Sequence, residues 1–213
     1  MSIKKFFVVS LSLSFYLNIG ANVAPPSQLD WGKTKTQMII SGYQFNSCQF
    51  GLDNAIEFCR VDNIKKPISF AEIYTVYFVN NYGLLKVLVQ GKDITNDIYG
   101  SDGKSQYAKI KSSLINKYPN IDGYQTESFE WIGRKLYNES DEFYECLGYD
   151  GCGSHIAYIY SSNESVEKGT VSIELKGYSR GLGGINLTYE SSLWSEALDW
   201  AQNRQSQADD DAL

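Results

Sequence analysis

Three segments in the second half of this 213-residue chain alternate apolar and polar residues with a period of two. They cover residues 155–160, 171–175 and 185–189, and a glycine-rich stretch over 177–184 separates the last two. Successive side chains of a strand point to opposite faces of a sheet, so this alternation predicts strands with one buried face and one exposed face. Turn-forming residues between them predict antiparallel connections.

The first half of the chain predicts a β-hairpin. Residues 68–79 and 84–90 are rich in aromatic and β-branched residues, and the turn sequence Asn80-Asn81-Tyr82-Gly83 lies between them. Residues 43–61 predict two short strands or a loop. Further strands are expected at about 125–133 and 142–147.

Helical signals occur at three places. Thr34 followed by Gln37 forms a capping box and predicts a helix over 34–42. Apolar residues from Tyr107 to Tyr118 recur at helical spacing, and Pro119 ends that pattern. A final helix is expected after residues 191–192, with an apolar face that ends at Ala201.

These elements predict an α+β fold in which antiparallel β meanders carry helices packed on one face. A single domain is expected over 29–202. The order of elements also suggests two similar halves, 29–91 and 104–190, each beginning with a helix and continuing as a meander. Residues 203–213 are polar and include Asp209, Asp210 and Asp211, so we expect a disordered acidic tail.

The N-terminus has the order of features typical of a secretory signal peptide. Lys4 and Lys5 precede an apolar stretch that is too short to span a bilayer, and the small residues Gly20 and Ala21 follow. We therefore expect residues 1–21 to be removed and the mature chain to be periplasmic or secreted, with no membrane span. The first cysteine, Cys48, lies far from this cleavage site, which argues against a lipid anchor.

Charge limits the possible partners. Removal of Lys4 and Lys5 leaves 17 basic against 25 acidic residues, a net charge of −8. Such a chain is repelled by nucleic acid and anionic lipid and attracted to basic partners. We expect no nucleic-acid partner and no cofactor, and favour a basic protein partner in the cell envelope.

The four cysteines of the chain, Cys48, Cys59, Cys146 and Cys152, all lie in the mature part. An even number in an oxidising compartment predicts two disulfides. Among three possible pairings, the sequence-local ones (Cys48 with Cys59 and Cys146 with Cys152) close most easily, and each would contribute about 2–3 kcal/mol. The spacings fit neither a zinc site nor a redox motif.

Catalytic patterns are weak. The sequence Gly100-Ser101-Asp102-Gly103-Lys104-Ser105 is shorter than a phosphate-binding loop and indicates a turn before a helix. The single histidine, His155, is interpreted as a structural residue. Carboxylates that could form a glycosidase pair are Glu127 and Glu130, or Asp141, Glu142 and Glu145. Three glycosylation sequons begin at Asn138, Asn163 and Asn186.

Aromatic residues are the compositional excess of this chain. It contains 16 tyrosines, many of them in or beside predicted loops, and tyrosine is enriched at interfaces. The alternative is that an antiparallel sheet simply favours tyrosine on half-exposed faces. We expect a binding surface on two loops, carried by Tyr144, Tyr149 and Asp150 in the first and by Tyr178 and Arg180 in the second.

Short stretches of the chain resemble small exported bacterial proteins of unknown function. They are Leu29-Asp30-Trp31-Gly32-Lys33-Thr34, the segment 107–118, and the ending Asp209-Asp210-Asp211-Ala212-Leu213. In layout, helix-plus-meander halves are similar to β-lactamase-inhibitor proteins and to the outer-membrane assembly lipoprotein BamE. The chain lacks the lipoprotein cysteine of the latter. No site residues are carried over from either.

Taken together, these features predict a non-enzymatic exported binding protein, such as an inhibitor or immunity protein against an envelope-degrading enzyme. One alternative is an accessory factor in envelope assembly or maintenance. Another is a hydrolase that uses carboxylates.

Overall fold

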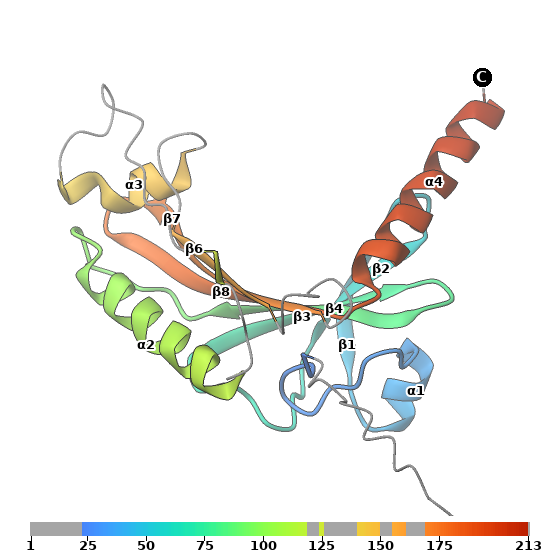
Figure 1. The fold of residues 1–213 in the computed structure, drawn as a ribbon, viewed down its shortest axis with the longest axis horizontal. Helices are drawn as coiled ribbons and strands as arrows, with labels where there is room; N and C mark the ends of the chain where they lie inside the picture. The colour runs from blue at the N-terminus through green and yellow to red at the C-terminus, as the bar shows by residue number, and fades with distance from the viewer. Residues whose placement is uncertain (1–22, 119–123, 126–139, 150–154, 161–168, 213) are drawn as a thin grey trace, which may run out of the picture.

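The computed structural model describes residues 23–118, 124–125, 140–149, 155–160 and 169–212. Eight strands in these ranges form one antiparallel sheet in the order β1-β2-β3-β4-β8-β7-β6-β5 (Figure 1). Their bounds are β1 Phe45–Gly51, β2 Ile56–Val61, β3 Ala71–Val79, β4 Gly83–Gly91, β5 Tyr124–Gln125, β6 Ile156–Tyr160, β7 Thr170–Ser179 and β8 Leu182–Glu190. The predicted leader and the residues Asp150 and Cys152 lie outside the described ranges.

The sheet consists of two meanders that meet in its middle. Strands β1 to β4 follow one another in space as in sequence, and β8, β7, β6 and β5 continue the sheet in reverse order. The seam is the antiparallel pair β4–β8, where Val87 lies opposite Tyr189 and Val89 opposite Leu187. The two meanders come from the two halves that the sequence singles out, and the similarity of those halves stays a prediction.

Within the described ranges, four α-helices accompany the sheet, together with a short 3₁₀ segment, η1 (Ser140–Glu142). Their bounds are α1 Lys35–Ile40, α2 Ser101–Lys117, α3 Phe143–Gly148 and α4 Trp194–Ala212. The predicted capping box is present at α1, where the Thr34 side chain accepts from the Gln37 backbone and the Gln37 side chain accepts from the Thr34 backbone. Among the described residues, no helix is both long and apolar enough to cross a bilayer.

The main core lies between one face of the sheet and the helices α1, α2 and α3. Alternate strand residues such as Val76, Val87 and Ile173 point into it and are fully buried. Tyr107 and Leu114 of α2, seven residues apart, join this core from the helix side. The predicted class, α+β with helices packed on an antiparallel sheet, is confirmed.

Helix α4 differs from the expectation that all helices share one face. Ala197 and Ala201 pack with Ile56, Val79 and Leu85 in a separate small cluster. Leu84 and Phe78 belong to the main core, and the residues that follow them, Leu85 and Val79, belong to the small cluster. Because consecutive strand residues point to opposite faces, the small cluster lies on the other face of the sheet. Figure 1 shows α2 and α4 on opposite sides of the sheet.

Three further expectations change. Residues 142–147, expected to form a strand, lie in η1 and α3, and the expected disordered tail from 203 is helical to Ala212. Of the strand expected at 125–133, the described ranges contain only β5 at 124–125. The sequon residue Asn186 is only 7% exposed in the middle of β8, which closes it to glycosylation in the folded chain.

Candidate binding surface

The predicted binding residues fall into two groups in the structure. Tyr149, Tyr178 and Arg180 are exposed, with 51% of Tyr149 and 48% of Tyr178 accessible to solvent. Tyr144 is completely buried. Asp150 lies outside the described residues.

Three chain segments meet at one end of the sheet and bring the exposed residues together. Gly148 at the end of α3 lies against the backbone of Gly177 in β7. On the other side of the β7–β8 hairpin, the Ile94 N–H donates to the Gly183 carbonyl at 2.8 Å, and the Asp97 N–H donates to the Gly181 carbonyl at 3.2 Å. The two loops predicted to bind are therefore neighbours, and the segment 92–100 joins them.

The segment 92–100 adds two exposed apolar side chains to this end of the molecule. Tyr99 is 59% exposed and Ile98 is 40% exposed, and Ile98 lies against Gly181. We call the exposed set the tyrosine end, and it consists of Ile98, Tyr99, Tyr149, Tyr178 and Arg180. Ile98 was not predicted from the sequence, because nothing in its polar surroundings indicates that it meets the hairpin.

An ion pair and close packing hold part of the tyrosine end in place. The Arg180 guanidinium pairs with the Asp141 carboxylate of η1, which links the hairpin to the segment before α3. The Tyr178 ring lies next to Gly184 of β8, where an added β-carbon would meet it. Burial, followed by the charges of Asp93 and Glu174, raises the pKa of Tyr178 above its ordinary value.

Tyr144 holds the tyrosine end together from inside. Phe143 and Tyr144 pack closely against four glycines. Two of these are the N-cap and a first-turn residue of α2, and two lie in the β7–β8 hairpin. A β-carbon on any of them would overlap Phe143 or Tyr144: Gly100, Gly103, Gly177 and Gly183. The glycine-rich hairpin is thus required for close packing of α3, and the prediction that Tyr144 binds a partner directly is wrong because it has no exposed surface.

Asp97 links Tyr144 to the start of α2. Its Oδ2 accepts from the Tyr144 hydroxyl at 2.8 Å and from the Gly103 N–H at 2.9 Å. Burial alone would raise the pKa of Asp97, but the N–H of Gly103, the Tyr144 hydroxyl and the N–H groups of Asp102 and Ser101 outweigh it and lower that pKa below 3.8.

The carboxylate of Asp97 also excludes phosphate at this place. Gly100 is the N-cap of α2 in a left-handed conformation and offers no side chain, so Asp97 satisfies the free N–H groups that begin the helix. The expected helix N-terminus is present, but residues 101–105 already belong to α2, and of this stretch only Gly100 lies before the helix.

We expect Asp97→Asn to lower the free energy of unfolding at pH 7 by about 1–2 kcal/mol, because hydrogen bonds to a charged group become bonds to a neutral one. The folded pKa is lowered, so the contribution of the carboxylate is present above pH 3.8 and decreases as the pH falls below that value. Urea unfolding of both proteins between pH 7 and pH 3 measures this. A difference that stays constant down to pH 3 contradicts the assignment.

The structure describes only some of the catalytic candidates. The His155 ring lies edge-on to the Tyr107 ring with 4.4 Å between centroids, and Asp141 is paired with Arg180. Glu127 and Glu130 lie outside the described residues.

The predicted disulfide between Cys48 and Cys59 is present and joins β1 to β2. Between the pairs Asn46–Arg60 and Gln49–Phe58, two residues of β1 face one residue of β2, and this bulge places Cys48 opposite Cys59 with 4.1 Å between Cα atoms. Cys146 is also disulfide-bonded, and its predicted partner Cys152 lies outside the described residues.

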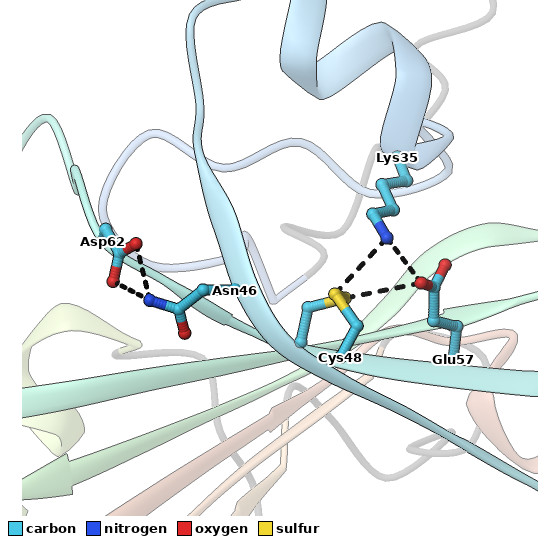
Figure 2. The surroundings of a disulfide bond; sticks show 6 residues. Lys35, Asn46, Cys48, Glu57 and Asp62 are labelled. Carbon is cyan, nitrogen blue, oxygen red and sulfur yellow. Dashed lines mark hydrogen bonds and ion pairs between the residues drawn. A yellow bond between two sulfur atoms is a disulfide. The ribbon is translucent and has the colours of Figure 1, made fainter.

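Polar groups surround this disulfide (Figure 2). The Lys35 Nζ of α1 lies 3.3 Å from the Cys48 Sγ and 2.5 Å from the Glu57 carboxylate, and Glu57 lies 3.6 Å from the Cys59 Sγ. Because both sulfurs are used in the S–S bond, they provide no thiolates to a metal, although Glu57 is near. The arrangement connects α1 to the first two strands.

The chain matches no known protein family, and no curated protein or solved structure is significantly similar to it.

Proposed function

We propose that this chain is an exported, non-enzymatic binding protein that uses the tyrosine end to hold a protein partner in the cell envelope. The observation that carries the proposal is that three segments in contact at one end of the sheet carry Tyr99, Tyr149 and Tyr178, each about half exposed. Monomeric proteins seldom gather large exposed apolar side chains without a use for them. Tyrosine gives large contact area with little side-chain entropy to lose.

The rigidity of this end supports the same function. The three segments that form it are fixed to one another by backbone hydrogen bonds, the Arg180–Asp141 ion pair and the buried Tyr144. A surface that is already in its bound shape loses less conformational entropy on association. Inhibitors and immunity proteins use such preformed surfaces, and we propose this role against an envelope-degrading enzyme with a basic surface.

Export is part of the proposal. The disulfide between Cys48 and Cys59 and the second disulfide-bonded cysteine, Cys146, are typical of oxidising compartments. The signal-like order of residues 1–21 supports the same location.

The test is affinity capture from an envelope extract, identification of the retained protein, and measurement of its Kd for purified variants. We expect the double variant Tyr149→Ser/Tyr178→Ser to weaken binding more than tenfold, since exposed tyrosines at the centre of an interface carry much of its energy. Phe50→Ser, which removes an aromatic residue that is 60% exposed on β1, serves as the matched control and should change Kd less than twofold. Equal losses in both variants would refute the assignment of the surface.

A further inference from the structure

A groove runs along α2 on the face of the molecule that carries the main core. Its larger part is a cavity of about 400 Å³ between α2, strand β8 and the segment 68–70. A second hollow of about 270 Å³ continues it toward Ile94 and Ile185 and shares Phe70 and Gln106 with the first. The volume of the larger part is in the range of small-molecule sites. We call this larger cavity the α2 groove.

The floor and walls of the α2 groove are apolar. Leu114, Leu187 and Tyr189 are buried residues of the main core that also border the cavity. Ile110 of α2 and Phe70 of the opposite wall are half-buried. An alkyl chain placed here would contact carbon on several sides, and its burial would be favourable at about 0.8 kcal/mol per CH₂ group.

The rim of the α2 groove is basic. Lys109, Ser113 and Lys117 are spaced four residues apart and form one row along α2, so the two lysines lie about 12 Å apart along the helix axis. Among the described residues, no carboxylate lines the 400 Å³ cavity and neither lysine forms an ion pair, although the Lys117 Nζ lies over the Tyr118 ring, 5.2 Å from its centre. A cavity rim that carries two lysines and no carboxylate is unusual in a chain with 25 acidic and 19 basic residues.

An unused hydrogen-bond donor lies near the same cavity. Tyr118 is 8% exposed and follows Lys117, and its hydroxyl has no partner among the described residues. Tyr118 belongs to the same buried cluster as Tyr189, which lines the cavity, and after burial its charge is the next cause that raises the pKa of Tyr189. Buried hydroxyls are normally hydrogen-bonded, so the Tyr118 hydroxyl, which neighbours the lining residue Lys117, has capacity for an acceptor.

We propose that the α2 groove binds an anionic amphiphile, the carboxylate of a short- to medium-chain fatty acid, with the acid group at the lysine rim, on Lys109 or Lys117, and the alkyl chain on the floor formed by Leu114 and Leu187. The groove requires both parts of such a ligand, because its floor gains only from apolar carbon and its rim gains only from negative charge. This site is separate from the tyrosine end, and its function does not depend on the partner proposed above.

The probe is octanoate, with octanol and octylammonium as matched ligands of the same chain length. Titrations followed by NMR of the Ile110 and Leu187 methyl groups should show saturable shifts with octanoate. Octanol should bind at least tenfold more weakly, and octylammonium more weakly still. Absence of saturation by octanoate, or equal binding of octanol, overturns the proposal.

Variants locate the site. We expect Lys109→Gln/Lys117→Gln to weaken octanoate binding at least tenfold while octanol binding changes less than twofold. Ser113→Phe places a ring between the two lysines and should abolish binding, whereas Ser112→Phe, an exposed neighbour that does not line the cavity, should leave it unchanged. Circular dichroism confirms that each variant is folded. Equal effects of Ser112→Phe and Ser113→Phe, or of the lysine changes on octanoate and octanol, overturn the assignment.

Discussion

Replacing Tyr144 by alanine is expected to lower the free energy of unfolding by about 3–5 kcal/mol, the range found when a fully buried aromatic side chain is removed. Tyr144 has no exposed surface, and it contacts the glycines of both α2 and the β7–β8 hairpin. Its loss leaves a cavity between these elements and leaves Asp97 without one of its hydrogen-bond donors. Urea unfolding at pH 7 measures the change.

Two variants make the test specific. Tyr144→Phe keeps the ring and removes only the hydroxyl, so we expect a loss of about 1–2 kcal/mol from the missing bond to Asp97. Tyr149→Ala removes a half-exposed ring from the neighbouring loop and should change stability by less than about 0.5 kcal/mol. A loss below about 1 kcal/mol for Tyr144→Ala would show that α3 is not held as described.

Replacing both Cys48 and Cys59 by alanine should lower the free energy of unfolding by about 3 kcal/mol, because the unfolded chain regains the freedom that a crosslink of 11-residue separation removes. The double variant leaves the disulfide bond of Cys146 intact, which reduction by a thiol would not. Chemical unfolding of both oxidised proteins gives the difference.

The control for this prediction is Lys35→Met, which removes the amine beside the sulfur and its pair with Glu57 but keeps the crosslink. Both members of that pair are partly exposed, so we expect a loss of less than about 1 kcal/mol. If Lys35→Met destabilises the protein as much as the loss of both cysteines, the polar contacts and not the crosslink account for the effect.

The sheet was predictable from local pattern because most of its strands have one covered face. Alternation at 171–175 and 185–189, and the hairpin of β3 and β4, mark strands that the structure contains with small changes in their ends. The seam between β4 and β8 was not predictable, since residues about a hundred positions apart pair there. Local sequence carries no information on which edges of two meanders will meet.

Helix α3 was missed because its aromatic residues suggested a strand. The residues Phe143, Tyr144 and Leu147 pack inward, a spacing that fits a helix and not the period of two. Ser140 and Asp141 before the segment and Gly148 at its end were available helix-boundary signals. Over such a short segment, the β-propensity of the aromatic residues outweighed these helix-boundary signals and led to the prediction of a strand.

The candidate surface was predicted in part. Two loops were identified by their tyrosines, and both lie at the tyrosine end, but exposure separates Tyr149 and Tyr178 from the buried Tyr144. The glycines over 177–184 indicated a turn, and their second role, close approach to α3, depends on a neighbour far away in sequence. The α2 groove could not be found from sequence because its two walls come from opposite halves of the chain.

The bulge in β1 has a consequence for the solubility of the folded chain. β1 is an outer strand of the sheet, and a straight outer strand offers free N–H and C=O groups to any other extended peptide. Ser47 has a φ of 47°, and Cys48 beside it is crosslinked to β2, so this strand deviates from a regular extended path and cannot easily straighten. The same crosslink that stabilises the fold therefore also protects that border against amyloid-like addition of further copies.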